Sequence, residues 1–196
     1  SPYQMGPQKH RIFMLDLLVG KGVDSLLDVG CGTGPIYELI TQRHMPVVYK
    51  GTDYSPAMIE IAKTTFPEGN WQVEDARHLD EKDNSWDCVL LMHALDHLDD
   101  YRAAIREAAR VAQKYVCIIL WRGFVGEGTN LNDRNMMGKV EGEKPWEDTH
   151  LQEYSKQALE EAFNESGLTI EETAEGELLN SDNSHYNFLY LLSKNE

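Results

Sequence analysis

The sequence has no long apolar run and no cluster of basic residues. Its longest uninterrupted apolar run, at 115–121, has seven residues, whereas a membrane span needs roughly 18. Lys and Arg number 18 against 33 Asp and Glu, which gives a formal net charge of −15. Surfaces that bind nucleic acid or an anionic membrane require clustered positive charge. The sequence therefore predicts neither a nucleic-acid partner nor a membrane partner.

Cysteine is scarce as well. The three cysteines, Cys31, Cys88 and Cys117, are odd in number and far apart, so they do not form the framework of a small disulfide-linked domain. They lie in or near predicted strands and are typical of buried thiols in a reducing compartment, which predicts a cytoplasmic location. A chain of 196 residues that is 41% hydrophobic is long enough to bury a sizeable core.

The most informative stretch runs from Leu26 to Gly34, where a short apolar strand enters three glycines at alternate positions. Gly30, Gly32 and Gly34 allow a sharp turn and a close approach of the backbone to a ligand. Pro35 then suits the first turn of a helix. The N–H groups and dipole at a helix N-terminus attract a carboxylate or phosphate. This turn is therefore a candidate ligand site.

The spacing around the turn helps to choose the ligand. The dinucleotide fingerprint G-x-G-x-x-G places its third glycine at position 35, which is proline here. Asp28 adds a carboxylate at the strand end, which suits a ligand with a positive group. The stretch from Asp28 to Gly34 resembles the first motif of class I S-adenosylmethionine-dependent methyltransferases, particularly the small-molecule and quinone-type group known as methyltransferase type 11.

Strand and helix patterns alternate along the chain. Strands are predicted at 26–29, 47–53, 71–74, 86–92, 115–121, 168–173 and 185–193, and helices at 8–19, 35–43, 56–65, 99–112 and 155–166. They predict a doubly wound, Rossmann-like α/β fold: a mostly parallel seven-stranded sheet with helices on both faces and a C-terminal antiparallel hairpin. We expect residues 1–196 to form a single class I methyltransferase domain. Within it, 1–22 would be an N-terminal helix or lid and 122–154 a substrate-side loop insertion.

Two further carboxylates lie at the ends of predicted strands. Asp53 lies 19 residues beyond Gly34, about where an acidic residue hydrogen-bonds the ribose hydroxyls. The resemblance implies that Asp75 takes the adenine amino group, that Tyr54 and Met58 flank the base, and that Asp28 and the glycine backbone hold the methionine part. The predicted cofactor-binding residues are Asp28, Gly30, Cys31, Gly32, Gly34, Asp53, Tyr54, Met58, Asp75, Ala76, Met92 and His97.

The segment 92–98 contains two histidines after the fourth predicted strand. His97 is expected to pack beside the cofactor, and His93 is the better candidate for a general base because it directly follows the strand. A hydrogen-bonded structural histidine explains either residue equally well. His93, Asp96 and His97 would share one helix face, but no cysteine or further carboxylate joins them at ligand spacing, so we expect no metal.

The resemblance implies that S-adenosylmethionine is the cofactor and that its methyl group passes to a small-molecule acceptor by in-line displacement. A base is needed only for a protonated acceptor of high pKa, and His93 or His150 is the candidate catalytic residue. Trp121, Arg122, Trp146 and His150 are candidates to shape the acceptor pocket. Two alternatives stay open: a cofactor-binding protein without turnover, and a nicotinamide-dependent oxidoreductase, against which Pro35 counts.

Overall fold

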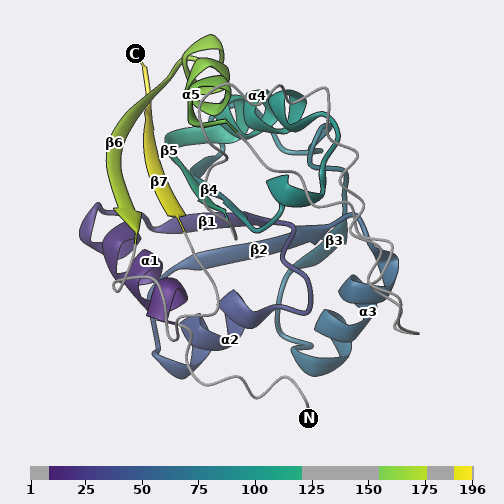
Figure 1. The fold of residues 1–196 in the computed structure, drawn as a ribbon. Helices are drawn as coiled ribbons and strands as arrows, with labels where there is room; N and C mark the ends of the chain where they lie inside the picture. Colours follow the sequence, from purple (N-terminus) through teal and green to yellow (C-terminus); the bar gives the residue numbers. More distant parts are fainter. Residues whose placement is uncertain (1–8, 121–154, 176–187, 196) are drawn as a thin grey trace, which may run out of the picture.

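The computed structural model describes residues 9–120, 155–175 and 188–195. They form a seven-stranded sheet with helices on both faces (Figure 1). The strands are β1 (Ser25–Val29), β2 (Val48–Asp53), β3 (Trp71–Val73), β4 (Trp86–Met92), β5 (Ala112–Leu120), β6 (Leu168–Glu175) and β7 (Phe188–Lys194). The helices are α1 (Lys9–Gly20), α2 (Pro35–Gln42), α3 (Pro56–Thr65), α4 (Tyr101–Val111) and α5 (Lys156–Glu165), with a short 3₁₀ turn, η1 (Leu95–His97).

The strand order is β3-β2-β1-β4-β5-β7-β6. The first five strands are parallel, and β7 runs antiparallel to both β5 and β6. The order therefore reverses between β1 and β4, which is the switch point where open α/β sheets bind ligands. The predicted doubly wound fold with its antiparallel hairpin is confirmed.

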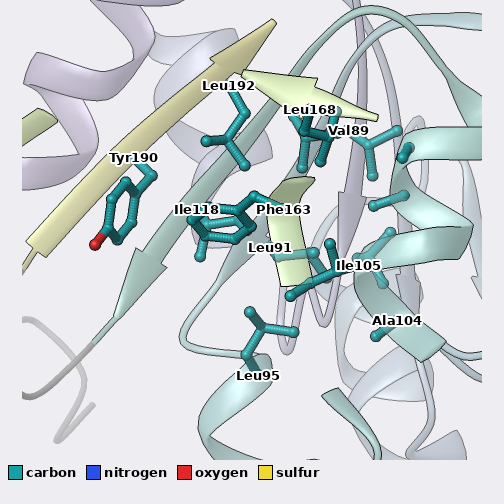
Figure 2. Close-up of a cluster of buried hydrophobic side chains, with 14 of the residues drawn as sticks. Val89, Leu91, Leu95, Ala104, Ile105, Ile118, Phe163, Leu168, Tyr190 and Leu192 are labelled. Atoms are coloured by element: carbon teal, nitrogen blue, oxygen red, sulfur yellow. The ribbon is translucent and has the colours of Figure 1, made fainter. Parts of the chain in front are cut away.

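The sheet is buried on both faces because its central strands are continuously apolar. One core lies under α4 and α5, and the other lies under α1, α2 and α3. Figure 2 shows the first core, where Phe163 of α5 and Ile105 of α4 meet Leu91 and Ile118 of the sheet. Phe163 also makes an edge contact with Tyr190 of β7, with ring centroids 5.1 Å apart.

Trp71 of the edge strand β3 packs against the glycine turn. A Cβ added at Gly34, Gly51 or Gly69 would come within 2.6, 2.5 or 2.4 Å of its indole ring. The indole N–H donates to the carbonyl of Phe66 at 2.9 Å. Such short separations cannot be relieved without moving the ring, so these glycines make room for Trp71.

The predicted element ends agree closely with the observed ones, except at the starts of β5 and β7. The last strand was predicted from residue 185, and its described part begins at Phe188, because 185–187 lie outside the described residues. Strand β5 begins at Ala112, immediately after α4, and pairs Ala112 with Trp86. Gln113 and Lys114 are exposed, so the apolar pattern begins only after them. The predicted loop insertion at 122–154 lies outside the described residues. In the described ranges, no helix is long and apolar enough to cross a membrane.

Candidate functional site

The turn from β1 into α2 has left-handed backbone at all three glycines. Their φ values are +81° at Gly30, +56° at Gly32 and +87° at Gly34. The N–H groups of Gly30 and Cys31 both donate to the carbonyl of Thr52, at 2.7 and 2.9 Å, which ties the turn to β2. A Cβ at Gly30 would lie 2.7 Å from the Cβ of Ala94, whereas one at Gly32 would meet no atom within 4 Å. Gly30 is therefore needed for packing, and Gly32 borders open space.

Asp53 at the end of β2 is held by backbone donors. The N–H of Gly32 donates to its Oδ2 at 2.9 Å, and the N–H of Ser55 donates to its Oδ1 at 2.8 Å. Each oxygen keeps a second lone pair, because an ionised carboxylate accepts at about four positions. Asp53 can therefore accept two further hydrogen bonds, the number that a ribose diol offers.

Asp28 is a buried carboxyl group with an unused acceptor. It is 1% exposed, and the Tyr49 hydroxyl donates to its Oδ2 at 2.7 Å. Its Oδ1 is buried and has no hydrogen-bond partner among the described residues. Burial raises the pKa of Asp28 to about 7, although the Tyr49 hydrogen bond and Arg11 oppose this rise. The site thus holds a carboxyl group that a cation would help to ionise.

Arg11 of α1 complements Asp28. Burial lowers the pKa of Arg11, while the nearby carboxylates of Asp28 and Glu38 act to raise it. Its Nε is buried and makes no hydrogen bond within the described chain. The sequence prediction missed Arg11 because an arginine in a helix gives no local sign of what lies across from it. An unused acceptor and an unused donor of opposite charge suit a zwitterion, an ammonium beside a carboxylate.

Asp75, which follows Glu74 just beyond the end of β3, is paired with Arg77. The guanidinium donates from Nε to Oδ1 at 2.9 Å and from Nη2 to Oδ2 at 2.7 Å, and the backbone N–H of Arg77 donates to Oδ1 at 2.9 Å. These hydrogen bonds lower the pKa of Asp75. Tyr54 and Met58 are exposed by 72% and 41%, so both side chains are accessible. The sequence prediction included Asp75 and missed the cation attached to it.

The end of β4 brings two histidines together. Met92 is buried, and His93, which follows it, has a left-handed φ of +57°. The His93 N–H donates to the carbonyl of Ile119 at 2.8 Å. The His93 ring lies 5.4 Å from the ring of His10, a buried residue of α1, with 47° between the ring planes. A non-glycine residue seldom adopts this left-handed backbone conformation unless the surrounding structure imposes it. The backbone at the end of β4 therefore sets the direction of the His93 side chain.

The fold collects most of the predicted residues at the carboxyl ends of neighbouring strands (Figure 1). The glycine turn and Asp53 are joined by a hydrogen bond, and Ala94 links the turn to the end of β4. Cys31 is buried, and burial together with Asp28 and Asp53 raises the pKa of its thiol. Ala76 packs against the core, and His97 lies in η1.

Trp121, Arg122, Trp146 and His150 lie outside the described residues. In the described ranges, no group of three or more His, Cys, Asp or Glu side chains is arranged to hold a metal ion.

Known proteins resemble this chain in both sequence and fold. Residues 27–119 match the family model described as a methyltransferase domain. A demethylmenaquinone methyltransferase of Thermotoga maritima is 28% identical over 54% of this chain and 46% of its own length. The ubiquinone/menaquinone biosynthesis C-methyltransferase UbiE of Desulfotalea psychrophila is 32% identical over 57% of this chain and 47% of its own length. The chain thus spans about half the length of these relatives.

Solved structures share the fold. The magnesium protoporphyrin IX methyltransferase of Synechocystis, crystallised with bound S-adenosylhomocysteine, has a TM-score of 0.70 and 19% identity, covering 95% of this chain and 83% of its own. An S-adenosylmethionine-dependent methyltransferase of Clostridium acetobutylicum has a TM-score of 0.68 and 12% identity, covering 98% of this chain and 94% of its own. At such identities the likeness establishes the fold. Together with the family match, it confirms the predicted resemblance to class I methyltransferases.

Proposed function

We propose that this chain, whose residues 27–119 match the family model described as a methyltransferase domain, binds S-adenosylmethionine and transfers its methyl group to a small-molecule acceptor. The observation that carries the proposal is the pair of unused buried atoms beside the glycine turn, Asp28 Oδ1 and Arg11 Nε. Buried polar groups without partners are costly, so these two atoms favour a ligand that forms a hydrogen bond with each of them. The methionine end of this cofactor is an ammonium next to a carboxylate.

The remaining residues fit the rest of the cofactor. Asp53 has two lone pairs available for the ribose hydroxyls, and Gly32 leaves space for the chain that joins the ribose to the methionine part. Asp75 would face the adenine amino group, with Tyr54 and Met58 beside the base. Met92 and His97, at and after the end of β4, would form the opposite wall. The names of the relatives support a small-molecule acceptor, because two of them concern quinones and one a porphyrin.

The bound cofactor would supply a methyl group already activated on a sulfonium. The protein then needs mainly to hold the acceptor in line with that methyl group, and such positioning is worth up to about 7 to 11 kcal/mol. His93, fixed at the strand end beside the turn, would take the proton of an acceptor that arrives protonated. His150 stays a candidate for the same step.

Calorimetric titration with S-adenosylhomocysteine tests the proposal. We expect a low-micromolar Kd, about −8 kcal/mol, and no binding of NADH. Asp53→Ala should abolish binding, and Arg11→Gln should weaken it about tenfold or more, because each removes a partner of a polar group. Asp83→Asn is the control, since Asp83 is a 70% exposed carboxylate that pairs with Arg110.

Failure of the folded wild-type chain to bind S-adenosylhomocysteine would contradict the proposal. Binding of NADH instead would favour an oxidoreductase. Turnover is measured separately, as conversion of S-adenosylmethionine to S-adenosylhomocysteine with a metabolite extract. Tight binding without any such conversion across extracts would identify a cofactor-binding protein rather than an enzyme.

A further inference from the structure

Asp75 is already partly occupied by Arg77. Its Oδ1 accepts from the backbone N–H and from Nε of Arg77, both at 2.9 Å, and its Oδ2 accepts from Nη2 at 2.7 Å and, over a longer 3.2 Å, from the same Nε. Each oxygen has two lone pairs. Oδ1 has two close donors, whereas Oδ2 has one close donor and only a long share of the Nε hydrogen, so Oδ2 is the oxygen with room for another donor. A backbone hydrogen bond closes the turn, because the His78 N–H donates to the Asp75 carbonyl at 2.8 Å. Arg77 therefore fixes where Asp75 can accept another hydrogen bond.

Arg77 has donors to spare. A guanidinium carries five N–H groups, and Asp75 takes those of Nε and one of Nη2. Within the described chain, no other acceptor bonds to this guanidinium. The Arg77 side chain is 39% exposed, against 24% for Asp75. The hydrogen bonds and charge of Asp75 foremost, and also Tyr54 and Asp100, raise the pKa of Arg77.

We propose that Asp75 and Arg77 read the adenine base jointly, an inference that rests on the proposed function. Asp75 Oδ2 accepts from the exocyclic amino group, and a guanidinium N–H that Asp75 does not use donates to a ring nitrogen flanking that group. A bidentate arginine–carboxylate pair is planar, so it presents an acceptor and a donor side by side. Adenine presents the complementary donor and acceptor along one edge. Arg77 is thus a specificity-determining residue.

A ligand–protein cycle tests this assignment. S-adenosylhomocysteine is compared with its 1-deaza and 7-deaza analogues, in which one ring nitrogen beside the amino group becomes C–H. We expect one analogue to bind the wild-type protein about tenfold or more weakly, because a charge-assisted hydrogen bond is lost. Arg77→Leu should bind S-adenosylhomocysteine about tenfold more weakly than wild type and should no longer distinguish that analogue from the parent compound. Arg77→Lys, which keeps the charge but not the planar fork, gives a second measurement if Arg77→Leu does not fold.

Arg43→Leu is the matched control. Arg43 is 37% exposed and pairs with Asp16 at 2.8 Å, at the opposite end of α2 from the turn. Arg43→Leu should leave the ratios between the Kd values of the three ligands unchanged. If the Arg77 variants bind all three ligands more weakly by one common factor, or if no deaza analogue loses affinity in the wild type, the inference is overturned while the proposed function stands. If wild type binds none of the three ligands, both are overturned.

Discussion

At the residue scale, the buried carboxyl group of Asp28 lowers folding stability near neutral pH and favours the binding of a cation. Its pKa rises from 3.8 to about 7 in the folded chain because the carboxyl group is buried. Between these values the folded chain holds a proton that the unfolded chain has lost. The free energy of unfolding therefore falls as pH rises from about 4 to about 7, by on the order of 4 kcal/mol in total. A bound ammonium would offset this cost by pairing with the ionised carboxylate.

Binding of S-adenosylhomocysteine should accordingly depend on pH through Asp28. We expect affinity to fall about tenfold per pH unit below pH 7 and to level off above it, because the ligand ammonium requires the ionised carboxylate. Calorimetry at pH 5.5 to 8.5, in buffers of different ionisation enthalpy, would show proton release near pH 6. Asp28→Asn, which can still accept from Tyr49, should bind weakly and without this slope. A variant that kept the slope would show that another group titrates.

The glycines of the turn should respond differently to alanine. Gly30→Ala places a methyl group 2.7 Å from Ala94 Cβ and should lower the free energy of unfolding by about 3 kcal/mol, from overpacking and left-handed strain together. Gly32→Ala meets no atom, so it should cost only about 1 kcal/mol of strain yet abolish S-adenosylhomocysteine binding. Urea unfolding and calorimetry measure the two effects.

The double variant Gly30→Ala/Ala94→Gly is the check on the clash. Ala94→Gly removes the methyl group that the new Cβ would meet. The double variant should therefore be more stable than the summed effects of the two single variants predict. No recovery would assign the loss to the backbone conformation instead.

At the element scale, buried charges hold β2, β3 and the following loop together. Lys50 of β2 donates to Glu74 at 2.8 Å and to Gln72 at 2.9 Å, and it also pairs with Glu81. The side chains of Lys50 and Glu74 are only 8% and 2% exposed. Because Glu74 directly precedes Asp75, this network positions the backbone that carries the predicted base-reading carboxylate of Asp75.

Removing the lysine should therefore be costly. Lys50→Met leaves Glu74 charged and buried without its cation, so the free energy of unfolding should fall by about 3 to 5 kcal/mol. Lys50→Met/Glu74→Gln should recover part of this, since the neutral amide is cheaper to bury. Lys156→Met, which breaks an exposed pair with Glu160 at 3.9 Å, should change stability by less than about 0.5 kcal/mol. Equal effects of the two lysine variants in urea unfolding would show that the network contributes nothing.

At the scale of the whole molecule, local patterns predicted the fold well. Continuous apolar strands alternate with amphipathic helices, and the handedness of their connections leaves few arrangements. The positions of the glycine turn and of Asp53 at the end of β2 were also predictable, because both positions follow from spacing along one βαβ unit. The early start of β5 was not, since Gln113 and Lys114 are polar and their strand conformation comes from pairing with β4.

The rest of the candidate site depends on contacts between distant segments. Arg11 and Asp28 belong to different elements, and their relation appears only when α1 packs on the sheet. The same is true of His10 and His93. Arg77 lies two residues from Asp75, yet an Asp-Ala-Arg sequence does not by itself indicate a bidentate pair. Spacing identifies residues within a motif, and it gives no information on which side chain of another helix faces them.

The place of β7 bears on how the protein is made. β7 is the last of the seven strands in sequence, yet it lies between β5 and β6 and pairs with both. During synthesis the edge of β5 stays unpaired, and β6 has no neighbour, until residues 188–194 leave the ribosome. An exposed apolar strand edge is a template for aggregation. A nascent chain stalled before residue 188 would therefore need chaperone protection, although every residue of the predicted cofactor site had already been translated.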